Sequence, residues 1–122
     1  MKIYFAHSQT IDYKAIYDML KSEPYFSKHE LILPHDGVTH ENHTRDFYCN
    51  IDVVIAEVSE PSTGLGIELG WASDYAVPIY CFYKKGSKPS GSLRAVTDII
   101  LEYEEDIDLR DRIMEIVEGL KS

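Results

Sequence analysis

Residues 52–72 read DVVIAEVSEPSTGLGIELGWA, and this stretch decides the fold. Its first seven residues, DVVIAEV, form a run of mostly β-branched apolar residues without polar alternation. Such a run is typical of a parallel strand that is covered on both faces. A Ser-Pro turn and two glycines then lead into a helical pattern over residues 64–76. A buried strand followed directly by a helix predicts a βα unit, from which parallel sheets are built.

The rest of the chain continues this alternation. Strands are predicted at 2–6, 30–34, 52–58, 77–83 and 98–103, helices at 11–20, 40–50, 64–76 and 109–120, and a flexible loop at 84–92. The order predicts right-handed crossovers and a single-domain α/β three-layer sandwich, Rossmann-like or flavodoxin-like, with a five-stranded parallel sheet. Ligands of such sheets bind beyond the carboxyl ends of the strands, so the segments that follow the strands are expected to form one pocket.

Composition limits the kind of ligand. The chain has 122 residues and a formal net charge of −9, whereas nucleic-acid binding normally needs a basic face. No apolar run has the length of a membrane span, and the N-terminal MKIYFAHS lacks the pattern of a signal peptide. Cys49 and Cys81 do not have the spacing of a metal site or a disulfide framework. These features predict a cytoplasmic protein with a small-molecule partner and with no nucleic acid or membrane partner.

Glu68 is a lone carboxylate among apolar neighbours at the opening of the central helix. A solvent-facing acid favoured by the helix dipole is the simpler interpretation. The alternative is a desolvated carboxylate at the carboxyl edge of the sheet, which is a candidate nucleophile or acid–base group. Gly64 and Gly66 precede it and allow close approach of a ligand to the free N–H groups of a helix N-terminus, which favour an anion.

The stretch DVVIAEVSEPSTGLGIELGWA resembles the signature of the nucleoside 2-deoxyribosyltransferase superfamily, in particular its 2'-deoxynucleoside 5'-phosphate N-hydrolase (N-glycosidase) branch. The opening KIYFAHS and the segment PSGSLR extend the resemblance over nearly the whole chain, so residues 1–122 are expected to form one such domain. The resemblance implies cleavage of the N-glycosidic bond of 2'-deoxynucleoside 5'-monophosphates without a cofactor or metal. It places Glu68 on the catalytic glutamate, which forms a covalent glycosyl-enzyme.

The resemblance also implies a set of substrate-binding residues. Ser62 falls where the transferases carry an aspartate and the hydrolases a serine that contacts the 5'-phosphate. A hydroxyl donates to a phosphate, whereas a carboxylate repels it. Ser8 is similar to another phosphate contact, and Ser90 to a serine that reaches the phosphate site of the neighbouring subunit. The active protein is therefore expected to be a homodimer or a higher oligomer with shared sites.

One family residue is missing. The family carries an aspartate where this chain has Thr44, and Glu41 and Asp46 on either side are the candidates for the second carboxylate. This departure leaves open a nucleotide-binding module without catalysis. A transferase that exchanges bases on deoxyribose is a further alternative, because hydrolysis and transfer share the glycosyl-enzyme and differ only in whether water or a base resolves it.

Histidines gather near the second predicted strand. His35, His40 and His43 do not match the spacing of a standard metal site, so no metal is predicted. His35, just past the second strand, is instead a candidate for the nucleobase side of the pocket.

Overall fold

The structure, a computed structural model, describes residues 1–36 and 44–121. Five parallel strands form one sheet in the order β2-β1-β3-β4-β5. The strands are β1 (Lys2–His7), β2 (Glu30–Ile32), β3 (Val53–Glu57), β4 (Ile79–Lys84) and β5 (Ile100–Tyr103). The helices are α1 (Tyr13–Ser22), α2 (Thr63–Asp74) and α3 (Asp106–Lys121), with 3-10 turns η1 (Pro24–Lys28), η2 (Arg45–Asn50) and η3 (Gly91–Ala95). The predicted α/β sandwich with a five-stranded parallel sheet is confirmed.

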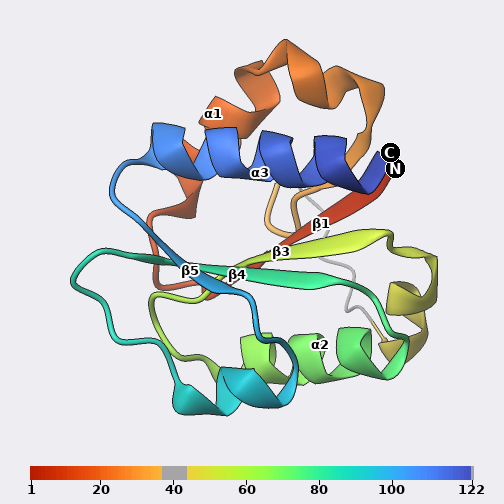
Figure 1. The fold of residues 1–122 in the computed structure, drawn as a ribbon, viewed down its shortest axis with the longest axis vertical. Helices are drawn as coiled ribbons and strands as arrows, with labels where there is room; N and C mark the ends of the chain where they lie inside the picture. Colours follow the sequence, from red (N-terminus) through yellow and green to blue (C-terminus); the bar gives the residue numbers. More distant parts are fainter. Residues whose placement is uncertain (37–43, 122) are drawn as a thin grey trace.

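Helices cover both faces of the sheet. Figure 1 shows α1 and α3 on one side and α2, with η2 and η3, on the other. Successive strand residues point to opposite faces, so Ile3 and Phe5 of β1 pack in the α1–α3 core and Tyr4 and Ala6 pack in the α2 core. All five residues of β3 are buried, which explains its continuous apolar sequence.

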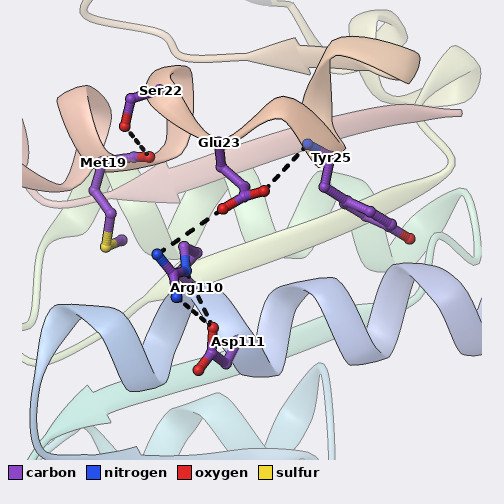
Figure 2. Close-up of polar contacts among 6 residues, drawn as sticks. All are labelled: Met19, Ser22, Glu23, Tyr25, Arg110 and Asp111. Carbon is purple, nitrogen blue, oxygen red and sulfur yellow. Dashed lines mark hydrogen bonds and ion pairs between the residues drawn. The ribbon is translucent and has the colours of Figure 1, made fainter.

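Polar contacts join α1 and η1 to α3. The Glu23 carboxylate accepts the backbone N–H of Tyr25 at 3.3 Å and pairs with Arg110 of α3 at 3.9 Å (Figure 2). The Arg110 guanidinium also donates to Asp111 at 2.9 Å. Glu23 therefore caps η1 and connects the end of α1 to α3, which lies on the same face of the sheet.

Two segments differ in detail from the sequence prediction. Residues 45–50 of the expected helix at 40–50 form the 3-10 turn η2, and residues 40–43 lie outside the described part of the chain. The expected loop at 84–92 ends in η3, which begins at Gly91. In both places a buried side chain packs the 3-10 helix against the α2 face, Tyr48 in η2 and Leu93 in η3.

The strand order creates a switch point between β1 and β3. From β1 the chain crosses to β2 on one side, and from β3 it continues to β4 and β5 on the other side. The connections after β1 and β3 therefore diverge and leave a crevice at the carboxyl ends of these strands, where ligands of doubly wound sheets bind.

Candidate active site

A cleft of about 680 Å³ occupies this switch point. It lies between the segment that follows β1, the segment that follows β2 and the first two turns of α2. Its lining residues are Tyr4, His7, Ser8, Gln9, Thr10, Pro34, His35, Pro61, Ser62, Gly64, Leu65, Ile67, Glu68 and Trp71. Five of the residues predicted from the sequence thus share one cleft, namely Ser8, His35, Ser62, Gly64 and Glu68.

The N-cap of α2 and the packing of its buried side determine the position of Glu68. Ser62 caps the helix, since its Oγ accepts the backbone N–H of Leu65 at 3.5 Å. Leu65 and Leu69 are buried against the sheet and fix the rotation of the helix. With that rotation Glu68 lines the cleft, half-buried, above the middle of β1.

Tyr4 is the hydrogen-bond partner of Glu68. Its Oη donates to the carboxylate and lies 3.2 Å from Oε1 and 3.3 Å from Oε2. The Tyr4 side chain is fully buried, with its ring edge-on to Phe47 at 5.4 Å and to Tyr48 at 5.6 Å between centroids. Burial and the neighbouring Glu68 carboxylate raise the pKa of Tyr4, so the phenol remains a donor. The partner of Glu68 is therefore held by the rigid centre of β1.

Two effects act in opposite directions on the pKa of Glu68. Burial raises the pKa of the Glu68 carboxyl above its ordinary value, and the hydroxyls of Tyr4 and Tyr48 act in the opposite direction. The Tyr48 hydroxyl is buried beside this pair and makes no hydrogen bond of normal geometry to the described residues. A carboxylate that is partly desolvated and fixed by one phenol is more basic and more nucleophilic than an exposed one.

His7 and Tyr17 build the end of the cleft near His35. His7 is 6% exposed; its Nδ1 lies 2.9 Å from the carbonyl oxygen of Ser8 and its Nε2 lies 2.5 Å from Tyr17 Oη. A carbonyl only accepts, so we assign the hydrogen to Nδ1, and Nε2 accepts the phenol hydrogen. Burial lowers the pKa of His7, which agrees with this neutral form. Both ring nitrogens are thus engaged within the protein, and His7 has no free nitrogen for acid–base work.

Tyr17 links this wall to the segment after β2. Its hydroxyl also accepts the backbone N–H of His35 at 3.1 Å, and the rings of His7 and His35 lie 5.1 Å apart between centroids. Sequence analysis singled out neither Tyr4 nor His7 as a site residue. A polar side chain at the carboxyl end of a buried strand is the signal that points to His7.

The other predicted site residues lie elsewhere. Ser90 and Gly66 line a second cavity of about 500 Å³ between α2 and η3, which shares Ser62 with the cleft. Asp46 Oδ1 accepts the hydroxyl of Tyr75 at 2.7 Å, beyond the C-terminal end of α2, and Asp46 does not line the cleft. Glu41 lies outside the described residues. Within the described lining Glu68 is therefore the single carboxylate.

Residues 1–36 and 44–121 contain no group of three or more His, Cys, Asp or Glu side chains placed to hold a metal ion. Nor do they contain a helix with the length and apolar character needed to cross a membrane.

Known proteins resemble this chain in sequence and in fold. No protein-family model matches it. A protein of Nematostella vectensis that carries the provisional name 2'-deoxynucleoside 5'-phosphate N-hydrolase 1 is 31% identical over 86 residues, which are 64% of this chain. The match spans 58% of that relative, so the chain corresponds to a little over half of its length.

Solved structures share the fold over nearly the whole chain. The CMP N-glycosidase of Clostridium botulinum superimposes with a TM-score of 0.64 at 20% identity and covers 93% of this chain and 98% of its own. A conserved protein of Enterococcus faecalis V583 gives 0.63 at 14% identity, covering 95% and 98%. The 2-deoxyribosyltransferase of Bacillus psychrosaccharolyticus gives 0.54 at 19% identity, covering 91% of each chain. The resemblance inferred from the sequence is thus found again in the Nematostella vectensis relative, and the three solved structures show the same fold.

Proposed function

We propose that this protein cleaves the N-glycosidic bond of 2'-deoxynucleoside 5'-monophosphates and releases the free base and deoxyribose 5-phosphate. The observation that carries the proposal is the half-buried Glu68, held by Tyr4 in a cleft at the switch point of the sheet. The Nematostella vectensis relative, named for this hydrolysis, supports the choice of substrate. Glu68 is assigned the role of nucleophile.

The reaction proceeds through two displacements at the anomeric carbon. In the first, a Glu68 oxygen forms a bond to C1' while the C1'–N bond breaks, and the electron pair of that bond leaves with the base, which takes up a proton from solvent. In the second, a water oxygen bonds to C1' while the bond from C1' to the Glu68 oxygen breaks and its electron pair returns to the carboxylate; the attacking water gives a proton to solvent, and configuration is retained overall. Tyr4 keeps its hydrogen bond to the carboxyl group and fixes the attacking oxygen in position. Asp46 and Glu41 remain predictions for a second carboxylate.

The start of α2 is the proposed phosphate end of the cleft. Ser62 Oγ accepts the N–H of Leu65 through a lone pair, so its hydroxyl hydrogen remains available to a phosphate oxygen. Gly64, in the first turn, lines the same cleft at a helix terminus that favours negative charge. His35, next to His7 at the other wall, is the proposed contact for the nucleobase.

The direct test is incubation of the pure protein with each 2'-deoxynucleoside 5'-monophosphate, followed by chromatography of the released base. We expect base release from at least one monophosphate. A second free base added to the same reaction distinguishes water from a base as the group that resolves the intermediate, because transfer would yield a new nucleotide. Tight binding without any release would instead indicate a nucleotide-binding module.

Tyr4→Phe is expected to change the pH dependence of this reaction. The substitution keeps the buried ring but removes the phenol that favours the Glu68 carboxylate, so the pKa of Glu68 should rise further. The acid limb of the pH–rate profile should move to higher pH, and kcat at neutral pH should fall about tenfold, the scale of one hydrogen bond to a charged group. Tyr83→Phe, which removes a phenol outside the cleft lining, is the control. Superimposable profiles for Tyr4→Phe and wild type would refute this role of Tyr4.

We further propose that the active form is at least a dimer in which Ser90 completes the phosphate site of the partner. Ser90 caps η3, since its Oγ accepts the N–H of Ser92 at 3.2 Å, and it does not line the Glu68 cleft of its own chain. Mixing Glu68→Ala with Ser90→Ala subunits should raise activity above that of either parent, because each mixed dimer then holds one intact site. Full activity of a species that sediments only as a monomer would contradict the arrangement.

A further inference from the structure

A chain of hydroxyl groups connects the cleft to an acid beside it. Ser8, 3% exposed at the carboxyl end of β1, has its Oγ 2.8 Å from Thr10 Oγ1 and also accepts the backbone N–H of Thr10 at 3.2 Å. The Thr10 hydroxyl in turn donates to the Glu60 carboxylate. Ser8 and Thr10 line the cleft, and Glu60 stands two residues before Ser62, the N-cap of α2.

The carboxylate fixes the direction of every hydrogen in this chain. An ionised carboxylate only accepts, so the single hydrogen of the Thr10 hydroxyl is directed to Glu60. The contact between Ser8 and Thr10 then requires the hydrogen of Ser8. Ser8 consequently presents a lone pair, and no hydrogen, to the cleft. A phosphate dianion is also an acceptor, so it finds no hydrogen to accept from Ser8 unless the hydrogen bonds from Ser8 through Thr10 to Glu60 are broken.

The charge at this end of the cleft also disfavours a phosphate. No Lys, Arg or His within residues 1–36 and 44–121 forms an ion pair with Glu60. The described residues that line the cleft include no Lys or Arg that would offset it. Lys84 and Glu60 line one small cavity but form no ion pair, and Glu60 therefore places an exposed negative charge next to the helix terminus to which the phosphate is assigned.

We infer that Glu60 is a specificity-determining residue that, through Thr10 and Ser8, weakens the hold of the cleft on a 5'-phosphate. The inference rests on the proposed function for the location of the phosphate. It concerns the strength with which monophosphates are preferred over nucleosides, and Glu60 itself takes no part in the displacement at C1'.

Deoxyribose 5-phosphate and deoxyribose are the probes, because they differ only in the phosphate and require no chemistry. Glu60→Gln removes the charge and can still accept from Thr10. Since an exposed charge is screened by solvent, we expect calorimetry to show deoxyribose 5-phosphate bound about threefold to fivefold more tightly, with deoxyribose unchanged. The kcat/KM for monophosphates should rise by the same factor relative to nucleosides. Asp98→Asn removes the same charge just before β5, at the amino end of that strand and away from the cleft. It should change neither the affinity for deoxyribose 5-phosphate nor the ratio of kcat/KM values.

Thr10→Val separates the hydroxyl chain from the charge. It keeps the shape of the side chain and leaves Glu60 in place, but it releases the Ser8 hydrogen, so affinity for deoxyribose 5-phosphate should rise about twofold, a fraction of the value of one hydrogen bond. Weaker binding in Thr10→Val would show that Thr10 itself donates to the phosphate and would overturn the inference. So would equal changes for both sugars in Glu60→Gln, or no binding of deoxyribose 5-phosphate to either protein. A selective gain in binding without any base release would sustain the inference and refute the proposed function.

Discussion

Glu68→Gln is expected to lower base release by at least about 10³-fold, because an essential nucleophile contributes several kcal/mol to lowering the barrier. The amide has nearly the shape of the carboxylate, and its oxygen can still accept the hydrogen of Tyr4. The fold should therefore be retained, which circular dichroism and the unfolding midpoint would check. What disappears is the negative charge and the oxygen that is proposed to attack C1'.

A matched control separates this effect from a general change of charge. Glu102→Gln alters an exposed acid in the middle of β5, far along the sheet order from the cleft, and should leave turnover unchanged. Turnover of Glu68→Gln within about tenfold of wild type would exclude a covalent mechanism through this residue.

Ser62→Asp is expected to reverse the order of substrates. Aspartate caps a helix as well as serine does, so α2 should still begin at Thr63. The new carboxylate lies where the phosphate is proposed to bind, and we expect kcat/KM for monophosphates to fall about 100-fold, corresponding to a lost charge-assisted hydrogen bond and added repulsion. Nucleosides, which lack the phosphate, should be unaffected or improved.

Ser62→Asn serves as the control, since it supplies a neutral cap of similar size to aspartate. Its preference for monophosphates should lie close to that of wild type. Equal turnover of nucleoside and monophosphate by the wild-type protein would mean that the start of α2 is not a phosphate site.

Local sequence patterns predicted the fold because each element carries its own signal. The apolar run at 52–58 predicted a strand covered on both faces, which the structure shows as β3, and the alternation of strands and helices predicted a parallel sheet. The position of Glu68 followed from the same logic. Leu65 and Leu69 define the buried side of α2, and the carboxylate between them in sequence lines the cleft at the switch point.

Local sequence patterns do not predict contacts between residues that are far apart in the sequence. Tyr4 and Glu68 are 64 positions apart, and their hydrogen bond depends on the register of β1 against β3 and on the rotation of α2. The pairing of Asp46 with Tyr75 depends on η2 packing at the end of α2, which the expected helix at 40–50 did not foresee. The hydroxyl chain from Ser8 to Glu60 likewise joins two loops that no local pattern relates.

The central claim is that Glu68 forms a covalent bond to the sugar, and rapid-quench mass spectrometry tests it most directly. The protein is mixed with a 2'-deoxynucleoside 5'-monophosphate that it cleaves, quenched in acid within milliseconds, and the intact mass and proteolytic peptides are measured. We predict an added deoxyribose 5-phosphate residue on the peptide that contains Glu68, and no adduct in Glu68→Gln. Base release without an adduct at Glu68, or an adduct on another side chain, would contradict this mechanism.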